Sequence, residues 1–278
     1  MKSIGFMQGR LSDVIDGVIQ EFPRNSWEDE FQIANEIDIH TMEWTLDQKD
    51  LHRNPLLTET GRKRILQLCH KHAMFIPSLT GDCFMQYPFW KAEGALQTEL
   101  LADFLAIIKA CGILKIGIVI IPLVDNGRLA TLEQEDVLVS ILNKHTSVLR
   151  DLNVKIAFES DFSPQELRRF IDRLDPGSFG INYDIGNSAA LGFIPKQEFF
   201  NYGDRIINVH VKDRPLGSTT VPLGDGDADF ESVFDHLVKH NYTGNYILQT
   251  ARDGAGRHAQ VISEYLAQTK VWIAKYES

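Results

Sequence analysis

Three apolar runs in the second half of the chain end in side chains that commonly bind metal ions. The runs are Val154–Glu159, Gly180–Asp184 and Ile206–Val211, the last with His210 in its penultimate position. Two carboxylate oxygens and an imidazole nitrogen suit Mn²⁺, Mg²⁺, Fe²⁺, Co²⁺ or Zn²⁺, and they leave coordination positions for a substrate's oxygens. Gln249, near the end of the next run, could add an amide oxygen as a weaker fourth ligand. The pattern predicts a divalent metal site on Glu159, Asp184, His210 and Gln249.

Cationic and polar side chains follow the same runs and their neighbours. An arginine presents a planar fork of donors, so the phosphate or carboxylate of a substrate could bind here. Acids such as Asp213 and Asp253 lie beside these cations, so ion pairing at the rim is the alternative interpretation. The predicted substrate-binding residues are Arg10, Glu43, Asn187, Lys212, Arg214 and Arg252.

The alternation of segment types along the chain predicts elements that place these side chains together. Short β-branched and aromatic runs alternate eight times with longer amphipathic segments, which is typical of repeated βα units around a parallel sheet. In a closed barrel of such units, the carboxyl ends of the strands share one face, and neighbouring strands lie about 5 Å apart. We therefore predict an α/β fold, a (β/α)8 TIM barrel that forms a single domain over residues 1–278. A doubly wound open sheet is the alternative, but the chain has no GxGxxG or P-loop motif to support it.

The same patterns predict where each strand and helix begins and ends. Strands are predicted at Ser3–Met7, Thr41–Trp44, Phe75–Leu79, Lys115–Ile121, Val154–Glu159, Gly180–Asp184, Ile206–Val211 and Asn245–Thr250. Helices are predicted at Trp27–Glu36, Thr58–His72, Gly94–Cys111, Thr131–Leu152, Lys196–Phe200, Phe230–His240 and His258–Lys275, and a further one begins at Ser163. There, Pro164 and Glu166 complete a strong helix start. Pro122 and Gly112 should end the elements that precede them.

Composition excludes several classes of protein. The 278 residues contain 28 Lys and Arg against 38 Asp and Glu, a net charge of −10, which disfavours nucleic acid as a partner. The longest apolar run, Ile116–Val124, is about half as long as a membrane helix requires. Cys69, Cys83 and Cys111 form no CxxC pair, and no charged and then apolar leader opens the chain. We expect a cytoplasmic protein whose partner is a small molecule, with neither nucleic acid nor membrane involved.

Four motifs in the second half of the chain resemble a known family. They are Ile156–Glu159 (IAFE), Tyr183–Ser188 (YDIGNS), Asn208–Asp213 (NVHVKD) and Val221–Gly226 (VPLGDG). Together they resemble the sugar phosphate isomerase/epimerase family of the xylose isomerase-like TIM barrels, which includes ketose 3-epimerases, hydroxypyruvate isomerases and inosose dehydratases. The resemblance implies that Glu159, Asp184 and His210 are metal ligands, that Glu159 is a catalytic base, and that the protein forms a homodimer or homotetramer.

Two positions depart from that family's pattern. The family's fourth ligand and second proton-transfer group, a Glu ending the eighth strand, is matched by Gln249. An amide oxygen can coordinate a metal but cannot take a proton near neutral pH. Epimerases of the family often carry a substrate-binding His where this chain has Asn187, which can bind a hydroxyl group but cannot act as an acid. The expected two-base epimerisation is therefore in question at Glu159 and Gln249, the predicted catalytic residues.

The resulting hypothesis is a metal-dependent isomerase or epimerase that acts on a ketose or sugar phosphate through a metal-stabilised enediolate. A 1,2-isomerisation can return the same proton with one base, so Gln249 favours isomerase over epimerase. Glu43, Lys212 or Asp213 could instead supply a second group. The alternatives are a sugar-binding barrel without turnover and an abasic-site endonuclease, which would need more strand-end histidines than His210. An apolar wall over the site could be formed by Trp44, Phe84, Tyr87, Phe89 and Trp90, although packing in the core or in a lid explains the last four equally well. The stretch Asp82–Glu93 could be a lid that excludes water or a subunit contact.

Overall fold

The computed structural model describes the chain apart from residues 1–2, 16, 18–19 and 277–278. Eight parallel strands follow one another around a closed barrel, and the last strand pairs with the first. The strands are β1 (Ile4–Met7), β2 (Thr41–Leu46), β3 (Phe75–Gly81), β4 (Ile118–Leu123), β5 (Lys155–Ser160), β6 (Phe179–Asp184), β7 (Ile206–Val211) and β8 (Asn245–Leu248). The (β/α)8 TIM barrel is confirmed, and the open sheet is excluded.

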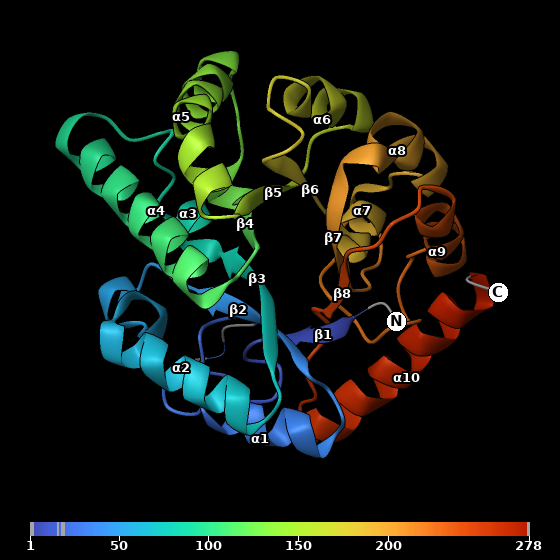
Figure 1. The fold of residues 1–278 in the computed structure, drawn as a ribbon. Helices are drawn as coiled ribbons and strands as arrows, with labels where there is room; N and C mark the ends of the chain where they lie inside the picture. The colour runs from blue at the N-terminus through green and yellow to red at the C-terminus, as the bar shows by residue number, and fades with distance from the viewer. Residues whose placement is uncertain (1–2, 16, 18–19, 277–278) are drawn as a thin grey trace.

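Helices form the outer layer of the barrel (Figure 1). They are α1 (Asp29–Glu36), α2 (Glu59–Lys71), α3 (Asp82–Gln86), α4 (Gly94–Leu114), α5 (Leu132–Asp151), α6 (Pro164–Ile171), α7 (Ile185–Leu191), α8 (Pro195–Tyr202), α9 (Phe230–Lys239) and α10 (His258–Tyr276). Short 3-10 turns are η1 (Leu51–Arg53), η2 (Pro55–Leu57), η3 (Asp125–Gly127) and η4 (Gly203–Arg205). Among the described residues, no helix is both long enough and apolar enough to cross a membrane.

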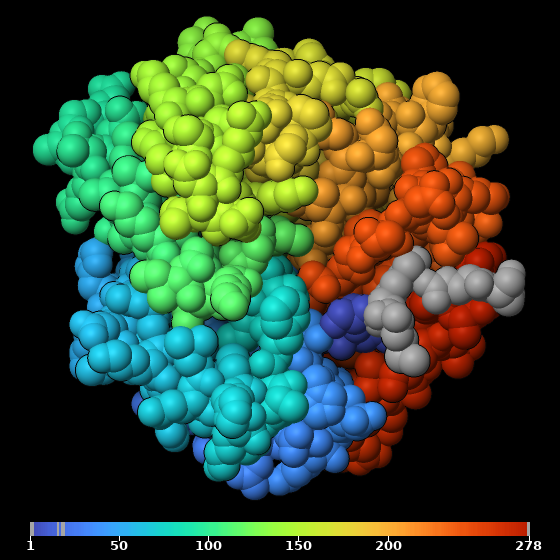
Figure 2. Space-filling view, in the orientation of Figure 1, coloured from blue at the N-terminus to red at the C-terminus, as the bar shows by residue number. Residues whose placement is uncertain are grey.

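Both ends of the chain meet at one seam of the barrel. Strand β1 pairs with β8, and α10 packs against α9 and both of these strands. Figure 2 shows the blue start of the chain beside its red end on one face of the molecule. The first and last segments therefore complete the same ring.

Side-chain caps explain why several helices begin where the sequence predicts. Thr58 accepts a hydrogen bond from the amide of Gly61, and Thr131 accepts one from the amide of Gln134. Ser163 forms a capping box with Glu166, and a proline occupies the first turn of α6. Each cap satisfies a backbone donor that has no partner within the helix.

Several boundaries differ from the prediction, and one helix was missed. Pro122 lies inside β4, where it pairs in register with Glu159 of β5, so this proline does not end the strand. Gly112 lies inside α4, which continues to Leu114 and ends where Lys115 takes a left-handed conformation with φ of 60°. Tertiary pairing outweighs the local preference of both residues. Helix α7 was not predicted, because its cap, Asp184, was interpreted only as the end of a strand.

The aromatic stretch after β3 packs in the core instead of covering the barrel. Phe84, Phe89 and Trp90 are buried, as is Trp44 on β2, and only Tyr87 of the predicted wall is exposed, at 55%. Phe84 and Phe89 pack edge to face against one another, and both contact Phe104 of α4. The short helix α3 faces the carboxyl end of the barrel through its polar residues instead.

Candidate active site

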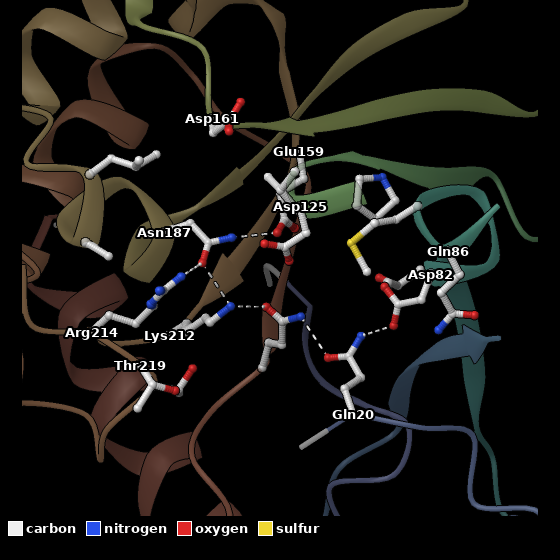
Figure 3. Close-up of a pocket in the computed structure, with 18 of the residues that line it drawn as sticks. Gln20, Asp82, Gln86, Asp125, Glu159, Asp161, Asn187, Lys212, Arg214 and Thr219 are labelled. Carbon is white, nitrogen blue, oxygen red and sulfur yellow. Dashed lines mark hydrogen bonds between the residues drawn. The ribbon is translucent and has the colours of Figure 1, made fainter. Parts of the chain in front are cut away.

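A cavity of about 620 Å³ opens at the carboxyl ends of the strands. Six of the predicted site residues line it: Arg10, Glu159, Asn187, Lys212, Arg214 and Gln249. Glu159 lies near the end of β5, and Lys212 and Gln249 directly follow β7 and β8. Figure 3 shows Asn187, Lys212 and Arg214 on one side of the cavity and Asp82 and Gln86 on the other. The predicted site residues therefore make up most of one wall of this cavity.

Glu159, Asp184 and His210 converge beneath this cavity. Each offers one ligand atom, and the three atoms lie within 4.8 Å of one another. Nδ1 of His210 is 3.1 Å from Oε2 of Glu159 and 3.8 Å from Oδ2 of Asp184. Strand register explains the convergence, since Asp184 and His210 are direct partners in the β6–β7 pair. Two hard oxygens and one imidazole nitrogen, all on buried residues, fit a divalent cation such as Mn²⁺, Co²⁺ or Zn²⁺.

Glu43 lies outside the cavity, which corrects its prediction as a substrate-binding residue. Its side chain has no exposed surface and occupies the barrel interior. Oε1 accepts hydrogen bonds from Thr80 and from Nε2 of His210, at 2.6 and 2.7 Å. Oε2 accepts hydrogen bonds from Ser78 and Asn208, at 2.6 and 3.0 Å. Both oxygens are thus occupied by protein donors, and Glu43 orients the ring of His210.

This arrangement presents Nδ1 of His210 to the two carboxylates of the triad. Burial alone disfavours the charged ring, but attraction to Glu43, together with hydrogen bonds to Asp184 and Glu159, raises the pKa of His210 well above its usual value. The amide of Asn182 also contacts this edge of the ring, 3.0 Å from Nδ1, and donates to Oε2 of Glu159 at 2.9 Å. Because the partner of one ring nitrogen decides what the other can bind, Glu43 leaves Nδ1 to face the cation site.

Lys212 adds a positive charge on the cavity side of the triad. Its Nζ is 3.1 Å from Oδ2 of Asp184, 3.1 Å from Oδ1 of Asn187 and 3.2 Å from Oε1 of Gln249. Burial opposes ionisation of Asp184, but Lys212 and His210 outweigh it and lower the pKa of this carboxyl to about 2. A cation bound at the triad would share the Asp184 oxygen with Lys212.

The predicted arginines fall in two different environments. Arg10 and Arg214 line the cavity. Arg10 donates to the carbonyl of Thr250 at 2.9 Å, and Arg214 donates to Oδ1 of Asn187 at 2.7 Å. Arg252 is not among the described residues that line the cavity, and it donates to the carbonyl of Ser12 at 2.9 Å. Positive charge near a substrate therefore comes from Arg10, Lys212 and Arg214.

Asp213, considered as a second proton-transfer group, is instead a structural residue. Its side chain is 1% exposed and accepts hydrogen bonds from the backbone amides of Gly224, Gly226 and Ala228. A Cβ atom at Gly226 would lie 2.2 Å from Oδ1 of Asp213, so only glycine fits there. Asp213 thus folds the loop that carries the VPLGDG motif.

Sequence reasoning missed two residues of the opposite wall, Asp82 and Gln20. Asp82 begins α3, lines the cavity and is 8% exposed. Its Oδ2 accepts a hydrogen bond from Nε2 of Gln20 at 2.6 Å. Burial first, and then the charges of Asp47 and Glu159, raise the pKa of Asp82 to about 7, against a lowering by Gln20 and Arg10. The place of Asp82 just after a strand was a usable signal, whereas Gln20 lies in a long loop that gave none.

Comparison with known proteins agrees with this geometry. The family model of the xylose isomerase-like TIM barrel matches residues 31–271. An inosose dehydratase of Clostridium tetani is 27% identical over 158 residues, which are 48% of this chain and 53% of that enzyme. The chain therefore matches about half the length of this curated relative.

Solved structures match over the whole chain. The zinc-bound IolI protein superimposes with a TM-score of 0.78 at 15% identity, covering 99% of each chain. A D-tagatose 3-epimerase-like protein gives a TM-score of 0.74 at 17% identity, covering all of both chains. At such identities these two structures support the fold, while the family follows from the match over residues 31–271. The chain belongs to the xylose isomerase-like TIM barrel family.

Proposed function

We propose that this protein is a divalent-metal-dependent isomerase or epimerase that acts on a ketose or ketose phosphate, with Glu159 as its base. The observation that carries the proposal is the position of Glu159, which belongs to the triad and also lines the cavity. A carboxylate in that place can face a bound substrate while its neighbours hold a cation. Glu159, Asp184 and His210 would hold the metal, with Gln249 as a fourth, weaker ligand.

Neighbouring amides fix the proposed base. Nδ2 of Asn187 donates to Oε1 of Glu159 at 2.6 Å, and Nδ2 of Asn182 donates to Oε2 at 2.9 Å. The two amides hold both oxygens of this carboxyl group in place beneath the cavity. Glu159 is therefore an oriented side chain in position to accept a proton from carbon.

Removal of a C–H proton beside a carbonyl produces negative charge on the carbonyl oxygen. A bound divalent cation supplies a Lewis acid that stabilises this charge. Glu159 accepts the proton, and Lys212 places an ammonium group at the same end of the cavity. Arg10 and Arg214 line the cavity beyond and can bind the hydroxyl groups or phosphate of the sugar.

Because Gln249 is an amide, Glu159 is left without a second proton-transfer group at the end of β8. It lines the cavity, but an amide does not exchange protons near neutral pH. A single base can carry one proton between neighbouring carbons, so Gln249 on its own favours 1,2-isomerisation. The similarity to an inosose dehydratase supports a second candidate, in which the same base removes the proton and passes it to a departing hydroxyl group, which leaves as water.

Metal content and hydrogen exchange test the proposal together. The purified protein and its Asp184→Ala, His210→Ala and Glu159→Gln variants are analysed for bound metal. Each is then incubated in D₂O with D-tagatose, D-fructose, their phosphates or an inosose, with Mn²⁺ or Co²⁺ added. We expect the unmodified protein to bind metal and to exchange a carbon-bound hydrogen of at least one probe. Equal metal content in the protein and the two alanine variants would disprove the site. Absence of both exchange and product formation with every probe would leave a sugar-binding barrel without turnover.

A further inference from the structure

We propose that Asp82 is the second proton-transfer group of this active site and acts from the wall of the cavity opposite Lys212. The inference rests on the proposed function, because it takes Glu159 as the first base. Asp82 supplies a carboxyl group that can transfer a proton, whereas the amide of Gln249 cannot transfer one. Asp82 directly follows β3 and begins α3, and β3 lies three strands away from β8 around the barrel.

Comparison of the acids in the cavity singles out Asp82. The described acidic residues that line the cavity are Asp82, Asp125, Glu159 and Asp161. Asp125 is exposed. Asp161 forms an ion pair with Arg128, with 3.1 Å between Oδ2 and Nε. Asp82 is almost fully buried and accepts a hydrogen bond from a neutral amide, so its charge is not fixed by that contact.

A chain of hydrogen bonds joins Asp82 to the position of the missing carboxyl group. Nζ of Lys212 donates to Oε1 of Gln249 at 3.2 Å, and Nε2 of Gln249 donates to Oε1 of Gln20 at 2.9 Å. Nε2 of Gln20 then donates to Oδ2 of Asp82 at 2.6 Å. Figure 3 shows Gln20 beside Asp82 at the edge of the cavity. Oδ2 is thus anchored, and Oδ1 is the oxygen that can exchange a proton with a substrate.

The surroundings of Asp82 suit an acid that can be protonated in neutral solution. Burial contributes most to its raised pKa of about 7, Asp47 and Glu159 add to it, and Gln20 and Arg10 oppose it. A general acid works best when its pKa lies near the working pH. This electrostatic environment supports the assignment that the geometry makes.

The two carboxyl groups together can invert a carbon centre. Glu159 takes the proton from the carbon beside the carbonyl, the C–H electron pair forms the C=C bond, and the carbonyl oxygen becomes an oxyanion. Protonated Asp82 then gives its proton to the same carbon from the other side, the C=C pair forms the new C–H bond, and the carbonyl returns. Glu159 ends protonated and Asp82 ionised, and proton exchange with water restores both. With Asp82 included, the site favours epimerisation over one-base isomerisation.

The test separates proton removal from inversion. Asp82→Asn, Glu159→Gln and the unmodified protein are incubated in D₂O with D-tagatose or D-fructose and Mn²⁺ or Co²⁺. Deuterium in the recovered sugar and formation of the epimer are both followed by NMR. We expect Asp82→Asn to slow epimer formation at least about 100-fold, the low end of the effect of a general acid. It should keep deuterium exchange into the recovered sugar, which needs only Glu159, and bind the same amount of metal. Glu159→Gln should lose both exchange and inversion.

A matched control is Asp151→Asn, which removes an exposed carboxylate at the end of α5, not among the described residues that line the cavity, and should leave both rates unchanged. Epimer formation by Asp82→Asn at the unmodified rate would overturn the role of Asp82. So would an equal loss of exchange, inversion and metal, because that result would assign a structural role. Absence of both exchange and any isomerised product in the unmodified protein would instead disprove the proposed function itself, and with it the role of Asp82.

Discussion

Nε2 of His210 lies 2.7 Å from Oε1 of Glu43, and neither side chain has any exposed surface. A buried carboxylate behind an imidazole fixes the orientation of the ring and increases its basicity toward a metal on the other nitrogen. Burial opposes the charge of Glu43, but His210, Ser78 and Thr80 lower the pKa of its carboxyl below the usual value. Glu43 therefore stays ionised beneath the cation site.

Replacing Glu43 by Gln should weaken metal binding by about 10- to 100-fold, the usual effect of removing a group that orients a metal ligand. The amide keeps the shape of the side chain but removes its charge and offers one acceptor oxygen instead of two. Competition with a chromogenic chelator measures the affinity. As a control, Glu135→Gln changes a buried carboxylate of α5 that binds Arg169 and Arg173, and it should leave the affinity unchanged. Unchanged affinity in Glu43→Gln would contradict the orienting role.

Replacing Lys212 by Met should strengthen metal binding by about tenfold, or roughly 1.4 kcal/mol. The ammonium group lies 3.1 Å from the Asp184 oxygen that faces the triad, so it competes with a cation for that oxygen and repels it. Titration calorimetry with Mn²⁺ measures the change. Lys239→Met, which removes an exposed ion pair with Asp235 on α9, serves as the control. Weaker binding in Lys212→Met would show that the ammonium group supports the cation site.

Asp82→Asn should also change how stability depends on pH. The pKa of Asp82 is raised from 3.8 to about 7, so the folded protein holds a proton that the unfolded chain releases near pH 4. Its contribution to the free energy of unfolding is complete below about pH 4 and is lost as the pH rises toward 7, by up to about 1.4 kcal/mol per unit. Urea unfolding midpoints at pH 5 and pH 7.5 should therefore differ less in Asp82→Asn than in the unmodified protein. Asp125→Asn should keep the original difference, and an unchanged difference in Asp82→Asn would refute the raised pKa.

Gly226→Ala should destabilise the loop after β7. The new Cβ would lie 2.2 Å from Oδ1 of Asp213, so the hydrogen bonds that the loop amides donate to this carboxylate must break or shift. Overpacking of this kind costs about 1–3 kcal/mol. Thermal unfolding measures the loss, and Gly254→Ala, where a Cβ would meet nothing within 4 Å, is the control. Equal melting temperatures for the two variants would show that the loop tolerates a side chain.

The depth of each side chain in the barrel decided which site residues the sequence could identify. Glu159 and Asp184 lie at strand ends, where an apolar run stops abruptly, and the pattern located both. Glu43 was placed at a strand end as well, but β2 continues to Leu46. Leu46 lies three residues beyond Glu43, which is about 10 Å along the strand at about 3.3 Å per residue. The length of a buried strand depends on pairing with its neighbours, which an apolar run alone does not reveal.

Asp82 was not among the predicted site residues. Strand β3 was predicted to end at Leu79 but continues to Gly81, which places Asp82 directly at the rim. Gln20 could not have been found, because its position depends on contacts with Asp82 and Gln249, which lie 62 and 229 residues away along the chain. Contacts between loops from distant strands leave no local pattern in a sequence.

The two halves of the chain meet at the β1–β8 pair and supply different side chains to the site. Glu159, Asp184 and His210 come from β5, β6 and β7, whereas Gln20 and Asp82 come from the first half. The loops after β1 and β3 can therefore change in sequence without replacing Glu159, Asp184 or His210, the proposed ligands of a cation. The first half of the chain could then vary around a triad that the second half keeps.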